Sequence, residues 1–170
     1  NPTKMKPHLI TLVLFLSLLC SCSPEDDDAN LFETSKTEEA KIAVEYSDIE
    51  TEILDLVNKY REDNNLSTLK VLNIISNEAN THTNYMINAG EVSHANFNTR
   101  AQNLVNNAGA KYVSENVAYG FSSAQAVVNG WINSLEHKKN IENPDMTHFG
   151  ISTKSDDNGR NYFTHIFIKK

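Results

Sequence analysis

The chain is poor in cysteine, and both of its cysteines lie close to the N-terminus. No cysteine follows Cys22, so the remainder of the chain has no disulfide framework and has to rely on its hydrophobic core. A long apolar run is also missing. The apolar stretch at residues 9–19 would rise only about 16 Å as a helix, whereas the hydrocarbon core of a bilayer measures roughly 30 Å. This stretch is therefore too short for a stable membrane span.

Basic side chains are scarce as well. The sequence has 15 Lys and Arg against 22 Asp and Glu. Setting aside the segment before Ser23 removes Lys4 and Lys6, which leaves 13 basic against 22 acidic side chains and a net charge of −9. Such a surface repels the phosphates of nucleic acid, whose binding depends on basic contacts. Nucleic acid is therefore excluded as a partner, and charge gives no reason to expect binding to an anionic membrane.

Residues 1–21 are predicted to be a secretory signal peptide. Met5 and Lys6 precede the short apolar stretch and small residues follow it, which is the pattern of a cleaved signal. The four residues before Met5 are interpreted as an upstream remnant.

The end of this signal, Leu19-Cys20-Ser21-Cys22, resembles the cleavage signal of bacterial lipoproteins. Leucine stands at position −3 and a small residue at −1 relative to Cys22, so we expect Cys22 to be the first mature residue and to carry lipid. Cys20 fits less well because Leu19 is bulky for the cleavage position. The alternative is that the two thiols form a disulfide or lie in a discarded peptide.

Residues 22–47 are predicted to be a lipidated, acidic linker, and residues 48–170 one domain. The run from Ser23 to Asp28 resembles the sorting segment that follows the lipidated cysteine in surface lipoproteins of the Bacteroidetes. This resemblance suggests exposure on the cell surface. A solvated spacer without a sorting role is the alternative.

Four helices are predicted from hydrophobic periodicity and capping residues. The first begins at the capping box Ser47-Asp48-Ile49-Glu50, and a second ends near Gly90, a suitable C-terminal cap. A third covers about 99–108. The fourth opens at Ser122 and is expected to bury Val127, Trp131 and Leu135 on one face.

Strands are predicted at 112–118, 147–154 and 161–169, and Asn158-Gly159 is a strong signal for a hairpin turn between the last two. The segment from Tyr162 to Ile168 is apolar on both faces. We therefore expect a central strand that is covered by helices on both sides. The predicted fold class is α+β, a three-layer α-β-α sandwich around a mainly antiparallel sheet.

An ordered set of short motifs carries a resemblance to a known family. The chain resembles CAP domains, the family of cysteine-rich secretory proteins, insect venom antigens and plant pathogenesis-related proteins, in their bacterial SCP-like form. The similarity covers about Ile53 to Ile168. Its motifs are the pair Asn58 and Arg61, the spaced set Ala79, His82 and Met86, and the segments Ser93-His94, Glu115-Asn116-Val117-Ala118, Trp131 through Ile141, Thr147 through Ile151, and Tyr162-Phe163-Thr164.

The resemblance implies a surface cleft with two histidines and acidic residues at its centre. The matching positions are His94, Glu115 and His137, and several family members bind zinc or another divalent ion at such a site. Two neutral imidazoles and a carboxylate are a reasonable ligand set for Zn²⁺, with positions left open for water. The resemblance also suggests that Asn116 supports the cleft wall, and we expect Ser134 to support the cleft as well.

One position departs from the family pattern. Many eukaryotic members have a second glutamate three residues after the helix tryptophan, where this chain has Ser134. The missing negative ligand should weaken metal affinity. Glu136 is close in sequence, but on a continuous helix it is expected to point elsewhere.

Other polar residues are assigned structural roles or weighed as alternatives. His82 is expected to be a hydrogen-bonded core residue, and His148 and His165 are expected to be structural. Ser134 and His137 are three residues apart on a predicted helix and could pair as nucleophile and base, but the sequence offers no orienting acid or oxyanion donor for a serine hydrolase.

These observations predict a lipid-anchored protein of the cell envelope, on the outer membrane and surface-exposed. Its CAP domain is expected to bind an extracellular protein, lipid or glycan through the His/Glu cleft, without established catalysis. The alternative is a metal-dependent hydrolase in which His94 and His137 hold the ion and Glu115 is a ligand or the base for a metal-bound water. An adhesion module with a purely structural cleft is a third hypothesis.

Overall fold

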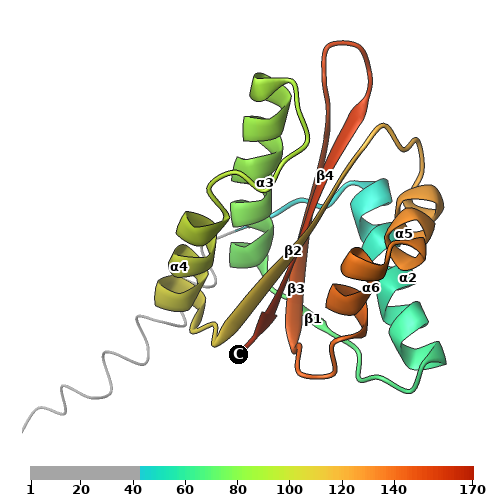
Figure 1. Cartoon of the computed structure of the whole chain (residues 1–170), viewed down its shortest axis with the longest axis vertical. Helices are drawn as coiled ribbons and strands as arrows, with labels where there is room; N and C mark the ends of the chain where they lie inside the picture. Colours follow the sequence, from blue (N-terminus) through green and yellow to red (C-terminus); the bar gives the residue numbers. More distant parts are fainter. Residues whose placement is uncertain (1–42) are drawn as a thin grey trace, which may run out of the picture.

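The computed structural model describes residues 43–170, so the predicted signal peptide, Cys22 and most of the linker lie outside the described residues. Figure 1 shows three layers, with a sheet between two groups of helices. The elements follow one another as α2 (Asp48–Asp63), β1 (Lys70–Val71), α3 (Asn73–Ala89), α4 (Phe97–Ala108), β2 (Tyr112–Tyr119), α5 (Ala124–Asn133), α6 (Leu135–Glu142), β3 (His148–Ser155) and β4 (Asn161–Lys169).

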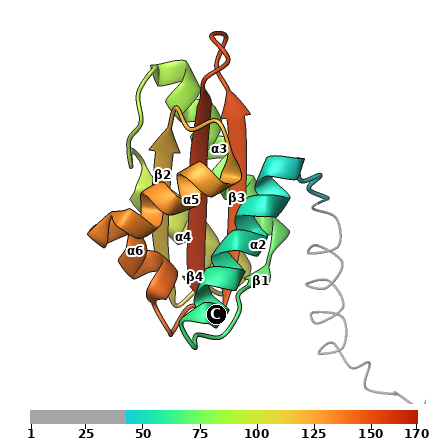
Figure 2. The ribbon, with the colours of Figure 1, turned by 90° about the vertical axis from the view of Figure 1, so that its right-hand side faces the viewer.

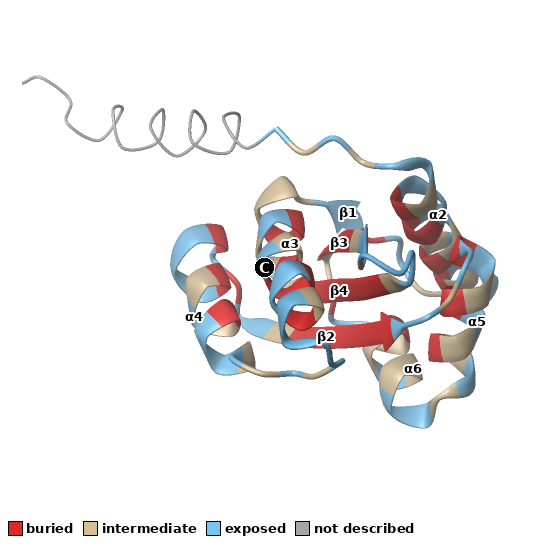
Figure 3. Ribbon diagram, turned by 90° about the horizontal axis from the view of Figure 1, so that it is seen from above, coloured by how far each residue is buried: buried red, intermediate tan, exposed pale blue. Residues whose placement is uncertain are grey.

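The sheet has the strand order β1-β3-β4-β2. β4 pairs antiparallel with both β2 and β3, and only the two-residue β1 pairs parallel, with β3. Every residue from Tyr162 to Ile168 is buried. α3 and α4 cover one face of the sheet, and α2, α5 and α6 cover the other (Figures 2 and 3). The predicted α+β sandwich with a central, doubly covered strand is confirmed.

The first helix begins at the expected capping box. The carboxylate of Glu50 accepts hydrogen bonds from the backbone N–H and the hydroxyl of Ser47, at 2.9 and 2.8 Å. Its other oxygen accepts the backbone N–H of Thr153 at 2.7 Å. One carboxylate therefore starts α2 and also holds the helix against β3.

α3 lies unusually close to β3 because Gly150 has no side chain. A Cβ atom at Gly150 would stand 2.5 Å from the backbone nitrogen of Ser76, at the start of α3. Within α3, the buried side chains include Ile75, Ala79 and Met86, and the helix ends at Gly90 in the left-handed conformation, with φ of 70°. The predicted C-terminal cap is confirmed.

The prediction of one continuous fourth helix that buries Leu135 is wrong. α5 ends at Asn133, Ser134 adopts φ −99° and ψ 118°, and α6 starts at Leu135. Ser134 is the C-cap of α5 and the N-cap of α6, and its hydroxyl bonds to the imidazole of His137 rather than to the backbone. The break rotates the chain, so Leu135 is 69% exposed while Trp131 is 1% exposed.

No helix among residues 43–170 has the length and apolar character needed to cross a membrane.

His165 is completely buried on β4 and neither of its ring nitrogens has a hydrogen-bond partner within the described part of the chain. The rings of Trp131, Phe149 and Phe167 surround it, with centroid distances of 5.5, 5.4 and 4.3 Å. Burial lowers the pKa of the imidazole from 6.5 to about 3. The native protein therefore keeps this group neutral at a pH where the unfolded chain would protonate it.

We predict that His165 contributes to acid destabilisation. As the pH falls from about 6.5 towards 3, the unfolded state takes up a proton on this imidazole and the native state does not, so stability is lost. At pH 5 the loss is about 2 kcal/mol. A His165→Phe variant should show a flatter dependence of unfolding free energy on pH in urea titrations. Phe167→Leu is the control, because it disturbs the same ring cluster and removes no titratable group. It should lower stability and keep the wild-type dependence of unfolding free energy on pH. The wild-type pH dependence in His165→Phe would contradict the prediction.

Candidate functional site

The candidate site lies at the edge of the sheet formed by β2. Adjacent side chains of a strand point to opposite faces. Glu115 accordingly contacts α4 on one face, and Asn116 contacts α6 on the other. Because β2 is the last strand of the sheet, groups from the two helical layers can meet across its free edge.

The carboxylate of Glu115 is the most densely bonded group of the site. Arg100 donates to both of its oxygens, from Nε at 2.9 Å and from Nη2 at 2.8 Å. Nδ1 of His94 bonds to Oε1 at 2.8 Å. Burial alone would raise the pKa of Glu115, but the hydrogen bonds from His94 and Arg100 and the charge of Arg100 outweigh it and lower the pKa. Glu115 is therefore an ionised carboxylate with both oxygens hydrogen-bonded.

His94 lies in the loop between α3 and α4, and its side chain is 53% exposed. Since a carboxylate can only accept, the contact with Glu115 places the proton of a neutral His94 on Nδ1 and leaves Nε2 as the free acceptor. The loop itself is held by His82, whose Nε2 bonds to the backbone carbonyl of Ser93 at 2.7 Å. His82 is buried as expected, and burial lowers its pKa.

His137 approaches the same edge from α6. Its Nδ1 shares a hydrogen bond of 2.9 Å with the hydroxyl of Ser134 at the junction of α5 and α6. Burial lowers the pKa of His137, and the nearby charge of His94 lowers it further. His137 is therefore held neutral beside His94, with Nε2 not bonded to any described residue.

The amide of Asn116 connects α6 to the sheet. It donates to the backbone carbonyl of His137 at 3.0 Å and accepts from the amide of Asn140 at 2.8 Å. Asn140 also donates to the backbone carbonyl of Glu115 at 3.2 Å. These bonds link the segments that carry Glu115 and His137 and form the wall between them.

His94, Glu115 and His137 line one hollow of about 360 Å³, so the structure brings the three predicted residues together. Residues that sequence analysis had not assigned to the site also line it: Tyr112, Glu136, Lys139, Asn140 and Asn143. On a continuous helix Glu136 is expected to point elsewhere, but it lines the hollow, and the helix is broken two residues earlier at Ser134. A second hollow of about 290 Å³ adjoins the first at His94 and Tyr112, and its other walls include Phe97 and Val113.

The side chains that could coordinate a divalent ion differ from the expected set of His94, Glu115 and His137. Both oxygens of Glu115 accept hydrogen bonds from Arg100 and its side chain is nearly inaccessible, while its bond to Nδ1 places it to orient His94. Among residues 43–170, no three His, Cys, Asp or Glu side chains are arranged to hold a metal ion together. The remaining candidate metal ligands are the Nε2 atoms of His94 and His137. A metal-bound histidine commonly donates its other nitrogen to a carboxylate, as His94 does here.

The Ser134 hydroxyl and the His137 imidazole do meet, as a nucleophile and a base would. The orienting carboxylate of a catalytic triad should bond to the second nitrogen of the histidine. Within the described residues, Nε2 of His137 has no such partner. We therefore interpret the hydrogen bond between Ser134 and His137 as a contact that orients His137 at the helix break.

Comparisons with known proteins relate this arrangement to other chains. The family model described as "CAP: Cysteine-rich secretory protein family" matches residues 54–167. An uncharacterized membrane protein of Bacillus subtilis is 31% identical over 124 residues, which are 71% of this chain and 34% of that protein. The chain thus spans about a third of the length of this relative.

Solved structures share the fold. An outer surface protein of Borrelia burgdorferi superposes with a TM-score of 0.68 at 20% identity, covering 75% of this chain and 96% of that chain. An extracellular protein containing a SCP domain from Bacillus anthracis gives a TM-score of 0.63 at 26% identity, covering 88% of this chain and 45% of that chain. The likeness to the Borrelia protein concerns the fold alone.

We predict that removing Arg100 is strongly destabilising. Arg100→Met leaves the buried carboxylate of Glu115 without its cation, which should cost about 3–5 kcal/mol in urea unfolding. The double variant with Glu115→Leu should recover most of this loss, because no buried charge is then left unpaired. Lys59→Met breaks an exposed pair with Asp63 and should change stability by less than about 1 kcal/mol. Additive losses in the double variant would refute the pairing.

Proposed function

Because the chain belongs to the cysteine-rich secretory protein (CAP) family, we propose that it is an extracytoplasmic binding protein whose cleft at β2 holds a ligand through His94 and His137. A divalent cation, Zn²⁺ in the first place, is proposed to bind between the two imidazoles. The observation that carries the proposal is that both histidines line the hollow with their Nδ1 atoms already bonded, to Glu115 and to Ser134, while neither Nε2 atom has a hydrogen-bond partner among residues 43–170.

The proposed ion site has two protein ligands, so its affinity should be low. Zn²⁺ is usually four-coordinate, and catalytic sites supply three protein ligands. Ser134 stands where many eukaryotic family members have a second glutamate, and its hydroxyl bonds to His137. A bound cation would supply a Lewis-acid centre with open positions for oxygen groups of an external ligand. The chain's own residues orient the imidazoles and keep His137 neutral.

The same geometry argues against the hydrolase alternative. A general base must have a free acceptor near the water that it deprotonates. Both imidazoles are assigned to the ion in this proposal, which leaves the carboxylates as candidate bases. Glu115 is nearly inaccessible, both of its oxygens accept from Arg100, and its pKa is lowered, so it is poorly placed to take a proton from water. Glu136 lines the hollow, but its carboxylate pairs with Lys139 at 2.8 Å and its side chain is 78% exposed. Binding without turnover is therefore the function that we propose.

We further propose that the protein resides in the cell envelope, attached by lipid at Cys22. The support comes from the sequence around Cys22 and from the names of similar proteins, which include an outer surface protein, an extracellular protein and a membrane protein. The lipid would attach ahead of the acidic linker that precedes α2.

Zinc binding is expected to depend on both histidines. In calorimetric titrations of the purified chain, His94→Ala and His137→Ala should each abolish or greatly weaken binding. Glu115→Gln should weaken it about 10- to 100-fold, as expected for a group that orients a ligand. Binding should also weaken from pH 7 to 5, because protons compete for the imidazoles. His148→Ala, on β3, is the matched control. Unchanged binding in the His94→Ala/His137→Ala double variant would overturn the ion site.

Lipidation is expected to give a defined mass increment. The protein extracted from membranes should have an acylated Cys22 as its first residue, detectable in the intact mass and in the N-terminal peptide. Cys22→Ser should yield a protein without acylation. Cys20 lies in the cleaved signal, so Cys20→Ser should give an acylated mature protein of wild-type mass. A soluble, unmodified wild-type protein would end this proposal.

A further inference from the structure

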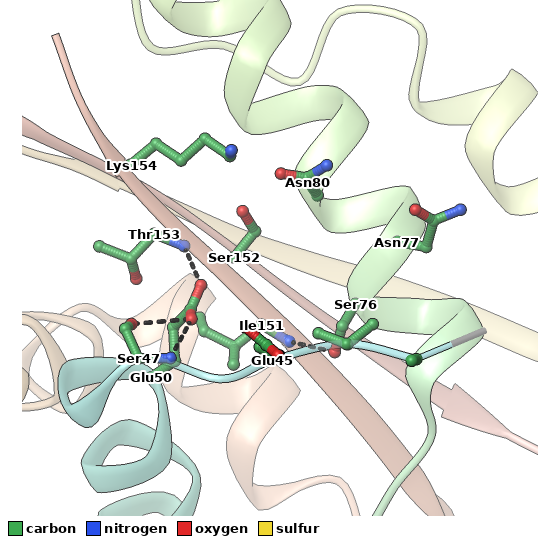
Figure 4. A pocket seen from close by; sticks show the side chains of 12 residues that line it. Glu45, Ser47, Glu50, Ser76, Asn77, Asn80, Ile151, Ser152, Thr153 and Lys154 are labelled. Atoms are coloured by element: carbon green, nitrogen blue, oxygen red, sulfur yellow. Dashed lines mark hydrogen bonds between the residues drawn. The ribbon is translucent and has the colours of Figure 1, made fainter.

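A second site is suggested by a hollow at the opposite edge of the sheet, beside β3. Its volume is about 370 Å³, within the range of small-ligand sites. Figure 4 shows its walls: the segment that leads into α2, one side of α3, and the last residues of β3. None of its lining residues belongs to the His94/His137 cleft.

The backbone donors of this edge are already used. The N–H of Ile151 donates to the hydroxyl of Ser76 at 3.1 Å, and the N–H of Thr153 donates to the carboxylate of Glu50 at 2.7 Å. An additional strand would need these donors to pair with β3. An extended peptide therefore cannot add to the sheet here without displacing two side-chain caps.

Several polar side chains facing the hollow have no hydrogen-bond partner among residues 43–170. From α3 these are the amides of Asn77 and Asn80, and from β3 they are the Ser152 hydroxyl and the Lys154 ammonium group. The carboxylate of Glu45 is also free at the entrance. In Figure 4 the side chains of Asn80, Ser152 and Lys154 border the same space. The hollow thus offers both donors and acceptors that no described residue engages.

The charges exclude simple ions as the preferred ligand. A cation would meet the carboxylate of Glu45 but also the ammonium group of Lys154, and the described residues contain no cluster of three metal-ligating side chains. An anion would have a single basic partner, Lys154, and would stand near the carboxylates of Glu45 and Glu50. An apolar ligand would leave the free amides without partners, which is unfavourable.

We propose that this hollow binds a neutral, hydroxyl-rich saccharide unit. Each sugar hydroxyl can donate and accept, so one ligand can accept from Lys154 and the amides of Asn77 and Asn80 and donate to Glu45. Ser152 can serve in either direction. The proposal is independent of the cleft at β2 and of any metal bound there.

The test uses four neutral disaccharides: maltose, cellobiose, lactose and N,N′-diacetylchitobiose. Saturation-transfer NMR on the full chain should detect binding of at least one at millimolar concentration. Asn80→Ala and Lys154→Ala should each weaken that binding about two- to tenfold, as expected from the loss of one or two hydrogen bonds. Asn80 is only partly buried and Lys154 is exposed, so both variants should fold, which thermal unfolding checks.

Two control variants separate this site from the rest of the molecule. Lys59→Ala, on the exposed side of α2, and His94→Ala, in the other cleft, should bind the sugar as the wild type does. The proposal is overturned if none of the four sugars binds, or if Asn80→Ala and Lys154→Ala bind as tightly as the wild type. It is also overturned if acetate or trialanine binds at Asn80 and Lys154 more tightly than every sugar.

Discussion

The contact on which the cleft depends is the bidentate pairing of Arg100 with Glu115. The carboxylate is nearly inaccessible at the edge strand, where an unpaired charge would be too costly to keep. Arg100 supplies the compensating charge from α4 and also donates to the carbonyl of Ala95, so α4, the preceding loop and β2 are joined at one point. His94 acquires its orientation from the same carboxylate. The exposed imidazole is thus held by a buried ion pair rather than by its own loop.

Both edges of the sheet are terminated by side chains, and a hollow lies beside each. On β2, the backbone carbonyls of Glu115 and Val117 accept from Asn140 and from the indole of Trp131. On β3, Ser76 and Glu50 take the backbone N–H groups. Such caps protect a sheet from pairing with another chain. They also leave polar helix residues close to each edge, which gives the two hollows their polar walls.

Much of the fold was predictable because its signals are local. The capping box at Ser47, the left-handed glycine that ends α3, and the turn at Asn158-Gly159 need only neighbouring residues to be recognised, and the structure has all three. The continuous apolar run of β4 indicated burial on both faces. The break at Ser134 was missed, because the apolar spacing of Val127, Trp131 and Leu135 suits an unbroken helix and gives no sign of the turn that exposes Leu135.

By itself, the sequence determined the order of the main elements, the central place of β4 and the three residues that meet at the cleft, because periodicity and motif order are properties of the chain. The two-residue β1 and the division between α5 and α6 were not predicted. The tertiary structure alone decided how those residues are bonded there. Arg100 belongs to none of the recognised motifs, yet it donates hydrogen bonds to both oxygens of Glu115, which is why we propose that this carboxylate orients His94. The free nitrogen of each histidine, and the free amides beside β3, likewise depend on partners distant in sequence. Hydrogen-bond partners are set by packing in three dimensions, which local spacing does not encode.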